Sequence, residues 1–319
     1  MVGRSEPVRA VDGISFGVKP GEVFCIAGES GSGKTTLGRT LLGLVPPTSG
    51  TVEVAGSDVT AGRGKALTAL RRRVQMIFQD PMGSLNPRQT VYEIVAEPAR
   101  IHGLEGSEEE LVAAALARAG LRPPERFFLS YPHELSGGQR QRVIIAAAII
   151  LEPDVLVADE PVSMLDASVR GEILRLLVEL KESMGLTLVL ITHDLGFAWA
   201  LADRIAIMYL GKIVELGPAE RVLTTPLHPY TRALIAASPE IGRRLPRVEL
   251  LGEPPNASAI PPGCRFHPRC PALQSGEAAE VEELNRTVAP ELLEVAPAHF
   301  VACHLVQAES GVAPATNRA

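Results

Sequence analysis

The stretch Gly28-Glu29-Ser30-Gly31-Ser32-Gly33-Lys34-Thr35 decides the fold, because it matches the phosphate-loop pattern G-x4-G-K-S/T. It follows the apolar run Val23–Ala27, which predicts a buried strand, and it opens a segment with leucines at helical spacing from Lys34 to just before Pro46. The glycines let backbone N–H groups turn inward around an anion, and the helix amino terminus adds its dipole. A Gly/Ser-rich turn that precedes a lysine by chance is the alternative, and the flanking strand and helix argue against it.

A phosphate site of this kind also needs groups that hold a metal ion and activate water. Lys34 is expected to reach the β- and γ-phosphates of a nucleotide, and Thr35 to offer its hydroxyl to Mg²⁺. The run Val155–Ala158 predicts a second buried strand, and Asp159 and Glu160 follow it. We assign Asp159 to Mg²⁺ and Glu160 to orienting and polarising the attacking water. A solvated acidic turn is the alternative for this pair.

Short apolar runs alternate with helical patterns along the chain, which predicts a doubly wound α/β fold. Leu186–Ile191 predicts a third buried strand, and Ser168–Met184 predicts a helix before it. Thr51–Gly56 and Tyr209–Val214 show more alternation, so we expect antiparallel strands beside the parallel core. From about Pro226 onward prolines cluster and periodicity weakens, which predicts a separate, loop-rich appendage.

Composition narrows the class of protein. The 319 residues are 46% hydrophobic and 21% charged, with a net charge of −6, so nothing in the charge favours nucleic acid as a partner. No leader is expected at the amino terminus, and the longest apolar run, Val143–Leu151, is too short to span a bilayer. The chain is therefore expected inside the cell, where its four cysteines indicate buried thiols or a metal site.

The run Leu135-Ser136-Gly137-Gly138-Gln139 resembles the signature of the ATP-binding-cassette (ABC) ATPases. Further motifs occur in the family's order. Gln79 falls at the family's Q-loop, Ser163–Asp166 resembles its D-loop, and His193 resembles its switch histidine. Each has a plainer interpretation alone, as a surface amide, a helix cap or a capped strand end, but together the motifs favour the family.

The resemblance implies the architecture as well. We expect an α/β fold with a P-loop NTPase core of the RecA-like type, an antiparallel β subdomain, an inserted α-helical subdomain at about 80–150 and a small C-terminal extension. The ATPase domain is expected over residues 1–235 and the extension over 236–319. Thr90–Gly103 and Glu108–Gly120 are the predicted helices of the helical subdomain, which would receive a permease helix.

The resemblance further implies that two cassettes face each other head to tail, with ATP and Mg²⁺ between the phosphate loop of one and the signature of the other. The implied catalytic residues are Glu160, His193 and Gln79, and the implied Mg²⁺ ligands are Thr35, Gln79 and Asp159. The implied nucleotide contacts are Gly28, Glu29, Ser30, Gly31, Ser32, Gly33, Lys34, Thr35, Thr36, Ser136, Gly137, Gly138, Gln139 and Asp166.

Two other segments resemble one branch of the family. Asp80–Arg88 and His228–Leu234 are similar to the oligopeptide and dipeptide import ATPases, whose relatives include nickel uptake systems, and Pro261–Pro271 with His299–His304 resembles their C-terminal extension. The implied function is ATP hydrolysis that energises an importer of oligopeptides or dipeptides. The implied location is peripheral, on the cytoplasmic face of the inner membrane.

The implied partners are two membrane-spanning permease subunits, a second ATPase subunit or a copy of this chain, and indirectly an external substrate-binding protein; no nucleic acid is expected. Three alternatives stay open at this point. The same motor could serve nickel or another small solute. The chain could be a soluble ABC ATPase of DNA repair or translation. In the third alternative, which is not enzymatic, the C-terminal cysteines form a metal-binding regulatory module and the cassette serves as its scaffold.

Two departures from the branch bear on the cofactors. Some members hold a 4Fe–4S cluster on four cysteines, whereas only Cys264, Cys270 and Cys303 occur here, with Glu277 roughly where the fourth would fall. The site is incomplete, completed by another ligand, or a buried cysteine core, and we expect no cluster. The aromatic on which cassettes stack adenine is also missing at Gly3–Glu6, and Phe16 is placed better in the core. Either aliphatic or arginine contacts replace it, or the chain starts late.

Overall fold

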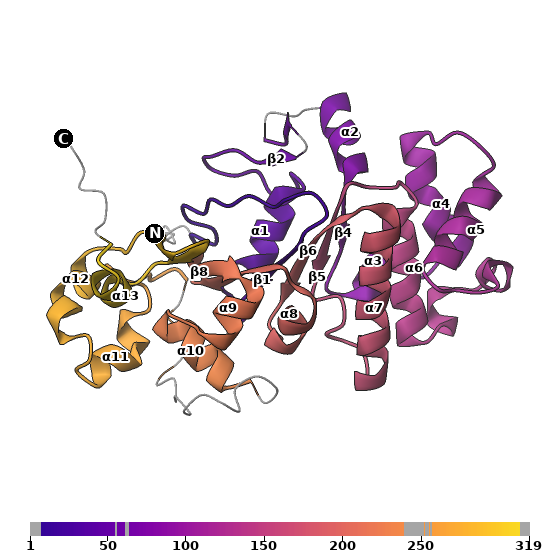
Figure 1. Cartoon of the computed structure of the whole chain (residues 1–319). Helices are drawn as coiled ribbons and strands as arrows, with labels where there is room; N and C mark the ends of the chain where they lie inside the picture. The colour runs from indigo at the N-terminus through magenta and orange to yellow at the C-terminus, as the bar shows by residue number, and fades with distance from the viewer. Residues whose placement is uncertain are drawn as a thin grey trace, which may run out of the picture. The chain divides into compact units, whose positions relative to one another are not determined.

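In a computed structural model, residues 8–54, 56–60, 64–238, 252, 255 and 257–312 are described. They form two compact units, which Figure 1 traces along the chain. Of these residues, the first unit contains 8–17, 23–37 and those described between 192 and 312, and the second contains 18–22 and those described between 38 and 191. None of the described helices has the length and apolar character needed to cross a bilayer.

A parallel sheet forms the core of the second unit. Its strands are β4 (Val74–Ile77), β5 (Val155–Asp159) and most of β6 (Thr187–Thr192), in the order β4-β5-β6. All residues of β6 are buried, which confirms the prediction of strands covered on both faces. An antiparallel strand was predicted within Thr51–Gly56, and the structure has one there that is shorter than the predicted stretch, because the chain turns back at Gly56 (φ 76°). Two short antiparallel strands result, β2 (Glu53–Val54) and β3 (Ser57–Asp58).

The helical part of the second unit covers the predicted helical subdomain. The helices of this unit are α2 (Lys65–Arg73), α3 (Pro81–Ser84), α4 (Val91–His102), α5 (Glu108–Arg118), α6 (Gly137–Ile149) and α7 (Ala167–Met184), with 3-10 turns at Pro124–Phe127 and Pro132–Glu134. Helices α4, α5 and α6 pack against one another. A capping box of Thr90 and Glu93 starts α4, and left-handed Gly103 ends it, so the predicted bounds were close.

Helix α1 (Lys34–Leu41) follows the phosphate loop and is shorter than predicted. Gly43 has a φ of 63°, and the N–H of Leu44 donates to the carbonyl of Arg39 at 2.9 Å. This is a Schellman ending, in which a left-handed glycine lets the last carbonyls find donors. The leucines between Leu41 and Pro46 therefore continue the helical pattern in the sequence, but the helix itself ends at Leu41.

The first unit has a mixed sheet. Its strands are β1 (Val23–Ala27), β7 (Arg204–Tyr209), β8 (Lys212–Pro218), β10 (His299–Val301) and β9 (Leu293–Ala296), in that order. Strand β1 is parallel to β7, and the remaining pairs are antiparallel. The predicted antiparallel element at Tyr209–Val214 is confirmed as a hairpin. Leu210 and Gly211 form its two-residue turn with φ of 41° and 78°, the conformation that matches strand twist.

The C-terminal residues join this sheet. Strand β10 pairs with β8, with Phe300 opposite Leu216, so the described part of the expected appendage is built into the first unit (Figure 1). The helices of this unit are α8 (Leu195–Leu201), α9 (Ala219–Thr224), α10 (Pro229–Ala236), α11 (Pro271–Gln274), α12 (Glu282–Thr287) and α13 (His304–Glu309), with 3-10 turns at His267–Arg269 and Ala279–Val281. The domain boundary between residues 235 and 236 stays a prediction.

Glu215 on β8 is fully buried and joins three parts of the first unit. One carboxylate oxygen lies 2.7 Å from Nε2 of His299 on β10 and accepts from the N–H of Leu227 at 2.9 Å. The other oxygen accepts from the N–H of His228 at 3.0 Å. Nδ1 of His228 in turn accepts from the N–H of Tyr230, which caps α10. A buried carboxylate is tolerated here because these groups satisfy it.

The neutral imidazole of His228 makes stability depend on pH. Burial lowers the pKa of His228 from 6.5 to about 4. As the pH falls below 6.5, only the unfolded chain takes up this proton, so the free energy of unfolding falls by up to about 3 kcal/mol by pH 4; at pH 7 and above the group adds no pH dependence. His228→Asn keeps a capping acceptor without the titration. In urea unfolding, its stability should therefore decline less steeply than that of the wild type below pH 6.5, and parallel curves would contradict this.

Candidate nucleotide site

The phosphate loop is closed tightly by backbone contacts that only glycine permits. A Cβ on Gly28 would collide with the carbonyl oxygen of Met208, and a Cβ on Gly33 with that of Ala10. Both glycines also have positive φ, of 151° and 101°. The loop is therefore packed closely against its neighbours, and α1 starts at its end, where a helix amino terminus favours an anion.

Lys34 places its charge inside this loop. Its side chain is buried, and the ammonium group donates to the carbonyls of Gly28 at 2.7 Å and Glu29 at 2.8 Å, with the Ser32 hydroxyl at 3.4 Å. Thr35 and Thr36 follow in the first turn of α1, where both are partly exposed. The loop thus combines a fixed cation with a helix amino terminus, which is the chemistry of a polyphosphate site.

Open space lies beside the loop in the first unit. A cavity of about 460 Å³ is lined by Glu29, Ser30, Gly31 and Ser32 of the loop, by Tyr209 and Leu210, and by Pro255 and Ala257. Its volume falls in the range of small-molecule sites. The first half of the predicted phosphate loop therefore borders a cavity large enough for a ligand.

In the second unit, the structure brings Gln79 and Glu160 together. The Gln79 amide nitrogen donates to a carboxylate oxygen of Glu160 at 2.9 Å. Glu160 follows β5 with a φ of 47°, a conformation that non-glycine residues rarely adopt, and its N–H donates to the Ile191 carbonyl at 2.8 Å. Asp159, the last residue of β5, is buried. A strained backbone thus holds the predicted water-activating carboxylate beside the predicted Q-loop amide.

The signature motif forms the start of α6. The Ser136 hydroxyl accepts from the N–H of Gln139 at 3.2 Å, and the Gln139 side chain accepts from the N–H of Ser136 at 2.9 Å, which is a capping box. A Cβ on Gly138 would lie 2.7 Å from a methyl group of Val169, so α6 approaches α7 closely. Asp166, at the N-cap position of α7, is exposed and makes no cap hydrogen bond with its side chain.

His193 lies at the turn between β6 and α8, and its side chain is exposed. The turn is fixed by its neighbours. The Thr192 hydroxyl accepts from the N–H of Asp194 at 3.0 Å, and Asp194 caps α8 by accepting from the N–H of Gly196 at 2.8 Å. His193 is therefore presented on a rigid strand end.

Comparisons with known proteins agree with this geometry. A family model described as ABC transporter matches residues 11–163, and one described as oligopeptide/dipeptide transporter, C-terminal region, matches residues 214–276. The oligopeptide transport ATP-binding protein AppF of Bacillus subtilis is 44% identical over 93% of this chain and 90% of its own length. The probable peptide ABC transporter ATP-binding protein y4tS of Sinorhizobium fredii is 45% identical over 93% of this chain and 83% of its own length.

The chain belongs to the ABC transporter ATP-binding family. Solved cassettes of the family confirm the predicted P-loop NTPase fold. The dimeric post-hydrolysis structure of the cassette MJ0796 bound to ADP and Pi has a TM-score of 0.59 at 32% identity, covering 66% of this chain and 90% of that one. The cassette cbiO1 of Clostridium perfringens, part of the complex cbiONQ, has a TM-score of 0.61 at 33% identity, covering 68% and 84%. This chain is thus an ABC ATPase, an enzyme.

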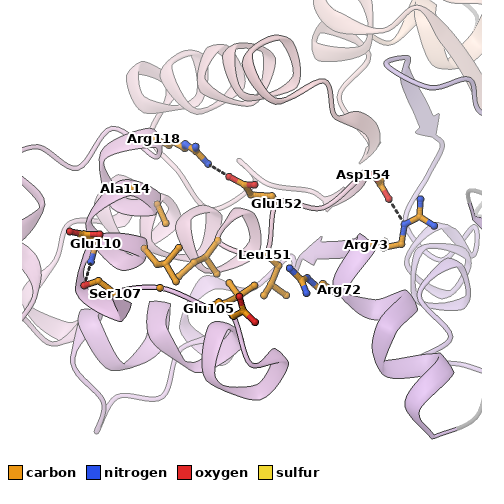
Figure 2. A pocket seen from close by; sticks show the side chains of 15 residues that line it. Arg72, Arg73, Glu105, Ser107, Glu110, Ala114, Arg118, Leu151, Glu152 and Asp154 are labelled. Atoms are coloured by element: carbon orange, nitrogen blue, oxygen red, sulfur yellow. Dashed lines mark hydrogen bonds and ion pairs between the residues drawn. The ribbon is translucent and has the colours of Figure 1, made fainter.

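A second cavity, in the second unit, contains none of the predicted site residues of this ABC ATPase. It measures about 510 Å³ and lies among α2, α5 and the segment between α6 and β5 (Figure 2). Two ion pairs belong to the lining of this cavity (Figure 2). They join Arg73 to Asp154 at 2.5 Å and Arg118 to Glu152 at 2.8 Å. Because both pairs are exposed to solvent, they contribute little to the free energy of unfolding.

The three C-terminal cysteines do not fit an iron–sulfur cluster. All are buried, and burial raises the pKa of the Cys264 thiol to about 12 and that of Cys303 to about 11, with the pKa of Cys270 raised as well. Among the residues that the structure describes, no group of three or more His, Cys, Asp or Glu could hold a metal ion. The cysteines instead line a small apolar cavity with Phe266, Ala272 and Leu305.

We therefore expect the ABC ATPase to contain neither iron nor acid-labile sulfide in stoichiometric amount. Cluster irons are normally held by four thiolates, whereas the C-terminal region supplies only three cysteines. The measurement is iron and sulfide analysis after anaerobic purification, with a four-cysteine ferredoxin carried through the same steps as a control. Stoichiometric iron in this chain would contradict the assignment.

Two contacts at the phosphate loop were missed by the sequence analysis. Tyr230 and Arg269 both bind Glu29. Tyr230 lies within the segment His228–Leu234, which was used only to identify the branch, and Arg269 lies next to one of the cysteines. A search for cations near these motifs could have found Arg269. The segment Gly3–Glu6, where the adenine-stacking aromatic would fall, lies outside the described residues. Phe16, which was expected in the core, is only partly buried and stacks on Phe24 with ring centroids 5.0 Å apart.

Proposed function

We propose that this ABC ATPase hydrolyses ATP between two head-to-tail cassettes to energise an importer of oligopeptides or dipeptides. The observation that carries the proposal is the phosphate loop, which has a buried lysine inside a glycine-closed turn at the start of α1. The nucleotide contacts are assigned to this loop, over residues 28–36. An exposed amide or hydroxyl cluster could not bind a polyphosphate as specifically, because it lacks the fixed positive charge.

The donor set suits Mg²⁺. Thr35 offers a hydroxyl, Gln79 an amide carbonyl and Asp159 a carboxylate, and such oxygen atoms are the ligands that Mg²⁺ prefers. Because the Gln79 amide nitrogen donates to Glu160, its carbonyl oxygen is left as an acceptor. When bound, Mg²⁺ would neutralise charge on the β- and γ-phosphates. Asp159, buried at the end of β5, would hold this ion through water.

Glu160 is assigned to orienting and polarising the attacking water. Its carboxylate is held by the Gln79 amide at 2.9 Å, and its backbone is held by Ile191 and Ser163. A base positioned in this way lowers the barrier by fixing the water and accepting its proton. His193, presented at the end of β6, is assigned to the γ-phosphate and the same water.

The signature motif is assigned to the ATP of the opposite cassette. Ser136 and Gln139 use their side chains to cap α6, which leaves the N–H groups of Gly137 and Gly138 as donors at the helix end. Asp166 would communicate across this interface. Loss of the γ-phosphate contacts after hydrolysis then favours the open pair, which is a population shift caused by differential contacts.

Two variants separate binding from hydrolysis. Lys34→Ala should weaken ATP binding by roughly tenfold or more, because a charge-assisted contact is lost, and turnover should disappear with it. Glu160→Gln should retain ATP and reduce turnover by about 100-fold or more. Equilibrium binding of a fluorescent ATP analogue and phosphate release measure the two effects. Normal ATP affinity in Lys34→Ala, or unchanged turnover in Glu160→Gln, would contradict the respective assignment.

Import of peptides is proposed from the branch to which this chain is similar. Relatives named as peptide ATP-binding proteins match nearly its whole length, and the C-terminal region that is described for that branch matches residues 214–276. The proposed partners are two permease subunits, a second ATPase subunit or a copy of this chain, and indirectly an external substrate-binding protein. The proposed location is the cytoplasmic face of the cell membrane, as a peripheral subunit.

Purification from solubilised membranes tests the transport assignment. The tagged chain should bring down two integral membrane proteins, and its loss should abolish uptake of labelled di- or oligopeptides because no ATPase then drives the permeases. A matched strain that carries Glu160→Gln should retain the complex but lose uptake. Loss of nickel uptake alone would favour the metal-importing alternative, and a tagged chain recovered without membrane partners would contradict a role in transport.

A further inference from the structure

The phosphate loop of this chain contains an acidic side chain. Glu29 follows Gly28, the first residue of the loop, and its side chain is 26% exposed. A carboxylate beside a polyphosphate opposes binding, because like charges repel through the partly desolvated loop. The loop therefore needs a cation that cancels this charge in addition to Lys34, which serves the phosphates.

Arg269 supplies that cation from the C-terminal region. Its two terminal nitrogens donate to the two carboxylate oxygens of Glu29, at 2.9 and 3.3 Å, in a bidentate pair. The Arg269 side chain is only 6% exposed, and it also donates to the Tyr209 hydroxyl at 3.4 Å. A bidentate guanidinium–carboxylate pair that is shielded from water fixes both partners in direction as well as charge.

The backbone of Glu29 is fixed by the same region of the chain. Its N–H donates to the hydroxyl of Tyr230 at 3.0 Å, and Tyr230 on α10 is fully buried. Tyr230 packs against Tyr209 and Phe266, with ring centroids 4.7 and 5.3 Å away. Because Phe266 lies three residues before Arg269, one aromatic cluster sets the position of both groups that hold Glu29.

The turn that presents Arg269 is anchored on its other side. The N–H of Arg269 donates to the carbonyl of Phe266 at 3.0 Å, and the N–H of Cys264 donates to that of Asn285 at 2.8 Å. A Cβ on Gly263 would collide with the same Asn285 carbonyl, so the backbone at Asn285 packs tightly against Gly263, just before the turn. Cys264 and Cys270 flank the turn and line the apolar cavity behind it. The buried cysteines thus support the segment that reaches the phosphate loop.

We propose that Arg269 is a positioning residue that neutralises Glu29 and, together with Tyr230, holds the phosphate loop in its ATP-binding form. The C-terminal extension then sets the nucleotide affinity of the cassette, in addition to any contact it makes with other subunits. The inference rests on the proposed function, because it takes ATP as the ligand of the loop.

A charge cycle between Arg269 and Glu29 tests the inference on the full chain. Arg269→Gln leaves an uncompensated carboxylate, so the affinity for a fluorescent ATP analogue should fall about tenfold. Glu29→Gln alone should tighten binding several-fold, and the double variant should bind within about threefold of wild type, because the repulsive charge is gone. The loss in Arg269→Gln should also shrink as KCl is raised from about 50 to 500 mM, since salt screens the repulsion.

Arg265→Gln is the control for a merely structural effect. Arg265 is another buried cation of the extension, but it pairs with Asp12 and the Leu210 carbonyl rather than with Glu29. Glu29→Gln should raise the affinity of Arg265→Gln by the same factor as it raises that of the wild type, because Arg265 and Glu29 are not coupled. If Arg269→Gln does not fold, Arg269→Lys, which retains the charge, should bind ATP within about threefold of wild type.

The outcomes separate this inference from the function on which it rests. The inference is supported if Glu29→Gln raises affinity by a larger factor in the Arg269→Gln background than in the wild type, and by the same factor in the Arg265→Gln background as in the wild type. Wild-type affinity in Arg269→Gln, a loss that Glu29→Gln does not restore, or weaker binding in Glu29→Gln alone would overturn it while leaving ATP binding at the loop intact. Normal affinity in Lys34→Ala would overturn both.

Discussion

The contact that the rest of the nucleotide site depends on is the backbone packing of the phosphate loop. Gly28 lies against the carbonyl of Met208 and Gly33 against that of Ala10, with no room for a side chain at either position. The loop is closed from outside in this way, and the Lys34 ammonium donates to its carbonyls of Gly28 and Glu29 from within. The hairpin turn adds a further restraint, since the N–H of Gly211 donates to the Ser32 carbonyl at 2.9 Å. The phosphate loop is thus shaped as much by β7 and its turn as by its own sequence.

In the second unit, charge and backbone strain are combined at Glu160, the proposed water-activating residue. Glu160 is held in a left-handed backbone conformation by the carbonyl of Ile191, and its carboxylate is held by Gln79. Such a conformation persists only where the surroundings enforce it, and here the buried strands β5 and β6 do so. The capping box of Ser136 and Gln139 applies the same principle at α6, because the side chains are used for structure while the helix end remains available to an anion.

Patterns with a local physical cause could be predicted from the sequence. The buried strands, the phosphate loop and the helix expected over Thr90–Gly103 follow from apolar runs, glycine spacing and helical patterns, and the structure has them close to the predicted bounds. The premature end of α1 at Gly43 and the reversal at Gly56 depend on backbone conformations that helical or alternating patterns do not encode. The pair of Arg269 and Glu29 joins residues 240 positions apart, so only the folded chain could reveal it. For the site residues, the structure shows the contacts within each unit, and the roles assigned to them are proposals.

Strand β10 limits where the chain can be truncated. Phe300 and Val301 pair with Leu216 and Glu215, so residues near the end of the chain cover the outer edge of β8. A fragment truncated after α10 would leave β8 with a bare row of backbone donors and acceptors, and Glu215 without its histidine partner. Exposed strands of this kind recruit other strands and lead to aggregation. The described part of the C-terminal region therefore protects β8 from self-association, and it also contacts the phosphate loop.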